Sequence, residues 1–282
     1  HIQILKDVIK TKKHMLVEKP LCTKTKDCLE IEKLAKNYPS VFWIAMEYRY
    51  MPPVSKFIKE IHSKTIGDLK TLTIRAHRFP FLKKVNDWNR FEKNTGGTLV
   101  EKCCHFFDLM RFIVKSEPVS VYASGGQDVN HLDEEYEGKK PDIIDNAYVI
   151  VNFENGSRSM LELCMFAENS EMQEELTATG NIGKIETSVP SNDSGKTTSN
   201  VRIGMRDGKT KQESISVDPK ILEAGHHHGS TYYEHLAFIN AVKNKLKPEV
   251  SLNDGLIAVA VGEAAETSIK FGRVVMLNEI IT

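Results

Sequence analysis

The chain has 282 residues, 40% of them hydrophobic and 27% charged, a composition typical of folded globular proteins that excludes a disordered or fibrous one. Lys and Arg together number 38, as do Asp and Glu, so the basic surface that a nucleic acid or an anionic membrane would need is not expected. No apolar stretch approaches the roughly 20 residues that cross a bilayer, and five scattered cysteines without C-x-x-C spacing indicate the reduced thiols of a cytoplasmic protein rather than disulfides or a zinc site.

The first part of the chain alternates helical and extended patterns. Apolar spacing predicts a helix over 2–13, followed by a short strand over 14–17. Thr23 is the expected cap of a second helix. Residues 41–46 form a near-continuous apolar run, the pattern of a strand buried on both faces. This alternation of helices and strands predicts that residues 1–47 belong to a parallel α/β sheet. Two or three strands, however, cannot form such a domain alone.

From residue 48 onward the pattern changes to short strands with few helices between them. Period-two alternation and turn residues predict strands over residues 69–77, 119–124, 146–153, 159–166, 174–179, 184–188, 201–205 and 213–217. Asn155-Gly156 is the strongest hairpin signal, and Asp207-Gly208 is a second. Two helical patterns close the chain, over residues 231–245 and 253–271. The pattern of residues 48–282 therefore predicts an α+β domain around one large, mostly antiparallel open sheet. The length of the whole chain fits two domains.

The segment Glu18-Lys19-Pro20 is the first candidate for chemistry. It follows a predicted strand, so it lies at the carboxyl end of that strand, where open α/β sheets bind ligands. A lysine there can give or take a proton, because partial burial readily lowers its pKa. The alternative is a surface charge pair before a turn, and three residues alone favour that alternative.

The second candidate segment begins at Gly96-Gly97 and is predicted to form one helix that reaches about Val114. Helical spacing places Glu101, His105 and Asp108 on one narrow face of it. A histidine one turn from a carboxylate suits a general base, because the acid orients the ring and adjusts its pKa. Two alternatives stay open: a polar arc that simply faces water, and a metal site, for which a single histidine is weak evidence.

A run of three histidines, His226-His227-His228, lies between two glycines just before a predicted helix. A metal cluster is one interpretation of this run, but neighbouring histidines cannot all point the same way. Hydrogen bonding to a substrate, or a solvated loop, is therefore the favoured interpretation.

Taken together, the order of these segments resembles the Gfo/Idh/MocA family of NAD(P)-dependent oxidoreductases, and most of all its inositol-dehydrogenase-like branch. The family pattern runs from an E-K-P segment through an R-x-x-P segment and a G-G…(D/E)…H…D helix to a final G-R-x-V-x-L. The matching segments here are 18–20, 49–52, 96–108 and 272–277. The resemblance covers essentially the whole chain, and the ordered set of motifs is specific.

This resemblance implies a particular domain arrangement. His1 matches a residue well inside a dinucleotide-binding Rossmann domain, so residues 1–47 would be the C-terminal remnant of that domain. Residues 48–282 would be the substrate-binding and oligomerisation domain. The sequence contains no G-x-G-x-x-G, the turn that holds the pyrophosphate in such domains. We therefore expect the chain as given to be inactive and its full-length parent to be a dehydrogenase.

The resemblance also implies the reaction and its residues. A hydride would pass between NAD or NADP and a CH–OH group of a sugar, an inositol or a related polyol. Lys19 would be the catalytic lysine, turned toward the nicotinamide by a cis Lys19–Pro20 peptide, and His105 would take the hydroxyl proton. Glu101 stands where inositol dehydrogenases carry Asp. The other expected contacts are Glu18, Lys19, Pro20 and Arg49 for the cofactor and His77, Trp88, Arg90 and His228 for the substrate.

The open sheet is the expected surface for self-association into a homodimer or homotetramer, as in the family. A sheet covered by helices on one side leaves its other face apolar, and such faces mark interfaces. The residues expected there are Val149, Val151, Leu161 and Leu163. The alternative function is a catalytically silent oligomerisation or binding module derived from the same family. No metal is expected in either case.

Overall fold

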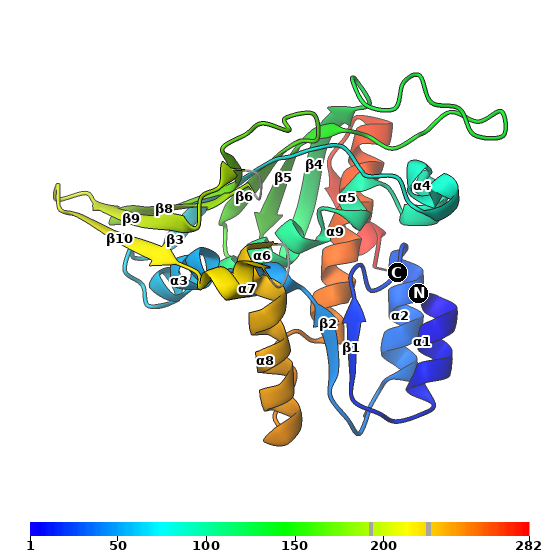
Figure 1. The fold of residues 1–282 in the computed structure, drawn as a ribbon, viewed down its shortest axis with the longest axis horizontal. Helices are drawn as coiled ribbons and strands as arrows, with labels where there is room; N and C mark the ends of the chain where they lie inside the picture. Colours follow the sequence, from blue (N-terminus) through cyan, green and yellow to red (C-terminus); the bar gives the residue numbers. More distant parts are fainter. Residues whose placement is uncertain (192–193, 224–226, 282) are drawn as a thin grey trace.

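A computed structural model describes residues 1–191, 194–223 and 227–281, which fold around two sheets (Figure 1). The N-terminal part contains α1 (Ile2–Ile9), β1 (Met15–Glu18), α2 (Thr25–Leu34) and β2 (Phe42–Ala45). α1 is shorter than predicted, but β1 and β2 pair in parallel and every residue of β2 is buried. The α/β pattern predicted for this part is therefore confirmed.

The rest of the chain carries a larger sheet and the helices that pack on it. Its strands are β3 (Leu69–His77), β4 (Pro118–Gly126), β5 (Asn146–Phe153), β6 (Arg158–Cys164), β7 (Met172–Gly180), β8 (Gly183–Pro190), β9 (Thr198–Met205), β10 (Thr210–Ser216) and β11 (Val275–Met276). Its α-helices are α3 (Pro52–His62), α4 (Glu92–Thr95), α5 (Thr98–Glu101), α6 (Cys104–Val114), α7 (Pro219–Glu223), α8 (Ser230–Lys243) and α9 (Leu252–Phe271). Short 3₁₀ helices are η1 (Glu47–Tyr50), η2 (Val85–Arg90), η4 (His227–Gly229) and η5 (Leu277–Glu279).

The strands of the large sheet follow the order β10-β9-β8-β7-β3-β6-β5-β4-β11. β3 and β6 are parallel, and the other neighbouring pairs within the described residues are antiparallel. The predicted hairpins at Asn155-Gly156 and Asp207-Gly208 join β5 to β6 and β9 to β10. Gly156 and Gly208 have φ of 80° and 89°, a conformation that glycine adopts without strain. The large, mostly antiparallel sheet is thus confirmed.

One face of this sheet carries the core. α9 packs along β4, and α3 packs on β8 and β9 (Figure 1). The prediction of which residues line the open face is wrong. The structure buries all four of them on the side of the helices: Val149, Val151, Leu161 and Leu163. Strand alternation places Tyr148 and Ile150 on the open face instead, and these side chains are 56% and 41% exposed. The alternation of apolar and polar residues along a strand divides its side chains between the two faces of the sheet. It does not tell which of the two faces the helices cover.

The N-terminus of α2 corrects a second prediction. Thr23 is not its cap, because Lys24 holds the N-cap position and makes no side-chain cap bond. The carboxylate of Glu263, on α9, instead accepts a hydrogen bond of 2.8 Å from the amide of Thr25. A free helix N–H needs a nearby acceptor, and here a tertiary contact supplies it.

The C-terminal helices also join the two sheets into one core. Trp43 of β2 is fully buried and donates its indole N–H to Glu234 of α8 at 3.2 Å. The amide of Ile44 donates to the carbonyl of Val250, just before α9, at 3.3 Å. A single cluster of buried apolar residues extends over both parts of the chain. No helix among the described residues is long and apolar enough to cross a membrane.

Candidate active site

The segment predicted as one helix over 97–114 is two helices. α5 ends at Glu101, and α6 begins at Cys104 after a short turn. His105 and Asp108 on α6 are 3% and 2% exposed, so the water-facing alternative is wrong. The break changes the direction of the chain between Glu101 and α6. The three polar side chains contact three different partners and do not form the single stripe that helical spacing predicts.

Lys19 lies directly after β1 and reaches the end of α5. The Lys19–Pro20 peptide is cis, as the resemblance implies. The Nζ of Lys19 donates to the carbonyl of Glu101 at 2.7 Å and lies 3.5 Å from its carboxylate Oε1. Burial opposes the charge on Lys19, but the Glu101 carboxylate outweighs it and raises the lysine pKa above its ordinary value. The expectation of a lowered pKa is therefore wrong, and this lysine keeps its proton.

A cavity of about 150 Å³ opens beside this ion pair. Its lining includes Lys19, Pro20, Trp88, Asn94 and Glu101. The structure thus brings one expected substrate contact, Trp88 of η2, to the expected catalytic lysine, although the two are far apart in the sequence. The mixture of charged, amide and aromatic groups suits a small polar ligand with a ring. The aromatic group can pack against the ring, and a small number of polar groups is enough to fix the orientation of the ligand.

His105 lies deeper than Lys19 and is held by an aromatic contact. Its ring is parallel to that of Tyr48, with centroids 4.1 Å apart and 2° between the planes. Its Nδ1 is buried with no hydrogen-bond partner in the part of the chain that the structure describes. Burial first, and then the charges of Lys19 and Lys102, hold the pKa of His105 well below its ordinary value. The imidazole is therefore neutral near pH 7 and able to accept a proton.

Two residues of this site are absent from the sequence predictions. Tyr48 and Lys102 are 1% and 4% exposed, and the Nζ of Lys102 donates to the Tyr48 hydroxyl at 2.5 Å. Burial lowers the pKa of Lys102 to about 7, and the nearby charge of Arg78 acts in the same direction. A lysine beside Glu101 and outside the arc of Glu101, His105 and Asp108, in a segment whose other residues are mostly apolar, is the sequence signal that could have identified Lys102.

Arg78 is a further missed residue, and it replaces the expected contact at His77. β3 alternates its side chains between the two faces of the sheet, and Ala76 is buried on the helix side. The side chain of Arg78, two residues after Ala76, lies on the same face as Ala76. The Nε2 of His77 instead lies 3.1 Å from Glu162 on the open face. The structure therefore does not bring His77 to Lys19. Glu174 pairs directly with Ala76 and is buried next to Arg78 on the helix side.

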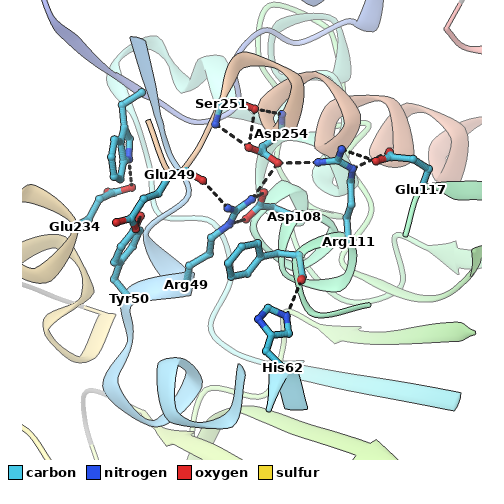
Figure 2. A network of polar contacts seen from close by, with 12 residues as sticks. Arg49, Tyr50, His62, Asp108, Arg111, Glu117, Glu234, Glu249, Ser251 and Asp254 are labelled. Atoms are coloured by element: carbon cyan, nitrogen blue, oxygen red, sulfur yellow. Dashed lines mark hydrogen bonds and ion pairs between the residues drawn. The ribbon is translucent and has the colours of Figure 1, made fainter. Parts of the chain in front are cut away.

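Arg49 is not a cofactor contact but the centre of a buried ion-pair network (Figure 2). Its guanidinium donates to both oxygens of Asp108, at 2.6 and 2.5 Å, and to the carbonyl of Glu249 at 3.0 Å. Asp254, at the start of α9, lies 3.3 Å away. These partners occupy all three nitrogens of Arg49 within the protein, so the assignment of Arg49 to the cofactor is wrong.

The remaining expected residues lie around the site without joining it. Arg90 is buried and binds Glu134 at 2.6 Å, which ties η2 to a neighbouring loop. Glu18 is exposed at the end of β1. Of the histidine run, His226 lies outside the described residues, and His228 is buried. It is His227 whose ring contacts Tyr48, at 5.3 Å between centroids. Among the described residues, no three His, Cys, Asp or Glu side chains gather as a metal ion would need.

Comparison with known proteins identifies the family. A model described as "Oxidoreductase family, C-terminal alpha/beta domain", that of GFO_IDH_MocA proteins, matches residues 58–277. The chain belongs to the Gfo/Idh/MocA family. Two relatives of this family are the uncharacterized oxidoreductase YrbE of Bacillus subtilis, 25% identical, and myo-inositol 2-dehydrogenase of Thermotoga maritima, 27% identical. The matches cover 99% and 100% of this chain and 75% and 78% of the relatives.

The Gfo/Idh/MocA fold is also evident in solved structures. Levoglucosan dehydrogenase, in complex with NADH and levoglucosan, superimposes with a TM-score of 0.81 at 18% sequence identity. The superposition covers 98% of this chain and 77% of that protein. At this level of identity the likeness demonstrates a shared fold.

Proposed function

We propose that this protein transfers a hydride between a nicotinamide cofactor and a CH–OH carbon of a sugar, an inositol or a related polyol. Family membership supports an oxidoreductase, and one relative is named as a myo-inositol dehydrogenase. The observation that carries the proposal is the contact of the Lys19 ammonium with Glu101 in a cavity that also contains Trp88. A neutral buried histidine, His105, lies close enough for the lysine charge to lower its pKa.

The side chains divide the acid–base work between them. In the oxidation direction, His105 accepts the hydroxyl proton of the substrate, since burial keeps its ring neutral. The protonated Lys19 donates a hydrogen bond to the same oxygen and stabilises the negative charge that develops there. Glu101 holds the lysine in place through its carbonyl and its carboxylate. A bound nicotinamide supplies the acceptor for the hydride that leaves the carbinol carbon.

The described residues fit one end of such a cofactor. The cavity of about 150 Å³ beside Lys19 and Pro20 can receive a single planar ring, with Trp88 and Asn94 along its wall. A glycine-rich pyrophosphate turn is not present in the sequence. Lys19 and Pro20 are therefore the residues that would hold the nicotinamide end, with Trp88 on the side of the substrate, and either NAD or NADP satisfies these contacts.

We further propose that residues 1–47 are part of a dinucleotide-binding domain and that residues 48–282 form the substrate domain. The parallel pairing of β1 with β2 and the two covering helices support this division. The outer edge of β1 borders an apolar cavity of about 240 Å³ lined by α1, including Ile4, Leu5 and Val8. A parallel strand with an apolar border of this kind is typical of a sheet that continues.

The experiment is a spectroscopic screen of NAD⁺ and NADP⁺ reduction against a panel of sugars and polyols. We expect turnover with at least one CH–OH substrate when the chain is tested within a protein that also carries a pyrophosphate-binding turn, and no turnover from the chain as given, whose sequence lacks that turn. Lys19→Ala and His105→Ala should each lower kcat by about 100- to 10,000-fold, the usual contribution of one acid–base group. Matched controls are Lys10→Ala and His235→Ala, because both residues are exposed and do not line the cavity, Lys10 just after α1 and His235 on α8. No turnover across the panel by the protein with that turn would exclude the proposed reaction, and full activity of both site variants would exclude the assigned residues.

A further inference from the structure

Arg78 differs from the other described arginines that are not exposed, because no carboxylate binds its guanidinium. The others that are not exposed each contact a carboxylate: Arg49, Arg75, Arg90 and Arg111. The guanidinium of Arg78 lies over the ring of Phe79, whose centroid is 4.7 Å from its Cζ. Its Nε is buried and has no hydrogen-bond partner within the described ranges. Arg78 as a whole is half-buried, but a buried N–H of a charged group without an acceptor is costly, so an external acceptor is expected there.

The backbone holds Arg78 rigidly at the end of β3. Its amide donates to the carbonyl of Cys164 at 2.9 Å, and its carbonyl accepts from the amide of Ala167 at 3.0 Å. The side chain follows Ala76 on the helix face of the sheet, and Ala76 pairs with the buried Glu174. The fixed backbone and the contact of the guanidinium with the Phe79 ring together restrict where the guanidinium lies, which is what recognition of a ligand group requires.

The charges around Arg78 include more cations than carboxylates. Lys19 contacts Glu101 at 3.5 Å, and the single carboxylate of Glu174 attracts the charges of both Lys102 and Arg78. After burial, the charge of Arg78 is the largest cause that lowers the pKa of Lys102, in agreement with the position of Arg78 at the end of β3, two residues after the partner of Glu174. Arg78 therefore supplies a positive charge in excess of the anionic groups at this site.

We propose that the substrate carries a carboxylate, as a uronic acid or another sugar acid does, and that Arg78 binds this group. The planar fork of a guanidinium matches the two oxygens of a carboxylate. The carboxylate is bound and not changed, because the hydride and the proton still leave the CH–OH group at Lys19 and His105. This inference rests on the proposed function and specifies its substrate class.

The first test compares neutral sugars with their acids as substrates of the protein that also carries the pyrophosphate-binding turn. The pairs are glucose with glucuronate and galactose with galacturonate, and glucose 6-phosphate is included as a different anion. We expect kcat/KM for the uronates to exceed that for the neutral sugars by about 10- to 100-fold, the range of a charge-assisted hydrogen bond. Equal values for the two members of each pair overturn the inference while the proposed function stands. Preference for the phosphate over the uronate also overturns it.

The second test changes the arginine and has a readout that does not depend on turnover. Arg78→Gln should raise the KM and the calorimetric Kd for the uronate by about 10- to 100-fold more than it raises those for the neutral sugar. Arg78→Lys should recover part of the loss, since it keeps the charge but not the fork. Arg75→Gln is the matched control, because it changes an arginine of the same strand that binds Glu175 on the open face. If the uronate binds but is not turned over, the proposed function is contradicted and the assignment of Arg78 stands. If Arg78→Gln raises the Kd for NAD(P) and leaves the Kd for the uronate unchanged, the assignment of Arg78 is overturned.

Discussion

The ring of His105 stacks on the ring of Tyr48 with their centroids 4.1 Å apart and their planes 2° from parallel. The stack covers one face of the imidazole, and the burial that results is the main cause of its lowered pKa. Tyr48 in turn accepts a hydrogen bond from Lys102. A neutral base at this site thus depends on a residue that has no acid–base role in the proposed reaction.

Replacement of Tyr48 should change the pH dependence of the reaction. Tyr48→Leu removes the stacked ring and admits water to His105, so the histidine pKa should rise toward its ordinary value. Because the unprotonated form is the active one, the acid limb of the kcat/KM profile should move to higher pH. Tyr48→Phe is the control, since it keeps the ring and loses only the hydroxyl. An acid limb that stays in place in Tyr48→Leu would contradict the role of the stack.

Lys102 should destabilise the fold more at low pH than at high pH. Its folded pKa of about 7 lies below the unfolded value of 10.5, so the unfolded chain binds more protons between these values and stability rises with pH there. Lys102→Met removes the buried charge. The substitution should therefore increase the free energy of unfolding at both pH values. The increase at about pH 6 should exceed the increase at about pH 9 by an amount on the order of a few kcal/mol.

Chemical denaturation of the wild type and Lys102→Met at both pH values measures this difference. Lys10→Met serves as the exposed control and should show no pH-dependent difference. A gain in stability that is the same at the two pH values would show that the lysine does not titrate in this range.

The pair of Arg49 and Asp108 should contribute to stability rather than to cofactor binding. Both side chains are buried, and Asp108→Asn removes the carboxylate that binds two nitrogens of the guanidinium and leaves only Asp254 at 3.3 Å, which should cost about 3–5 kcal/mol in the free energy of unfolding. The KM for the cofactor should stay unchanged in the folded fraction. The double variant Arg49→Met with Asp108→Leu should recover much of the loss, because it removes both charges. A raised cofactor KM at unchanged stability would restore the original assignment of Arg49.

The open face of the large sheet should be the surface of self-association. Tyr122, Tyr148 and Ile150 lie on neighbouring strands of this face and are 42%, 56% and 41% exposed. A contiguous apolar patch of this kind is typical of an interface. Ile150→Lys should shift the protein toward the monomer in sedimentation velocity, whereas Leu246→Lys, at an exposed position after α8, should not. A wild-type protein that sediments as a monomer at micromolar concentration would contradict the expectation.

The local structure of this protein could be predicted from its sequence where short-range physics is sufficient. The apolar run at 41–46 has no polar position, so it can only be a strand covered on both sides, as β2 is. Asn155-Gly156 supplies the positive φ that a tight hairpin needs, and β5 and β6 meet there. The motif around Lys19 and the Glu101–His105 pair also indicated the family and the site.

Only the tertiary structure decided how these pieces face one another. Alternation along β3 separates His77 from Arg78, but the packing of helices on one face of the sheet determines which of them reaches the site. Arg49 finds Asp108 across 59 residues, and neither residue alone specifies the other. The stack of Tyr48 on His105 forms because η1 and α6 pack together. Contacts distant in the sequence depend on the register and packing of whole elements, whereas periodicity and turn chemistry act within a few residues.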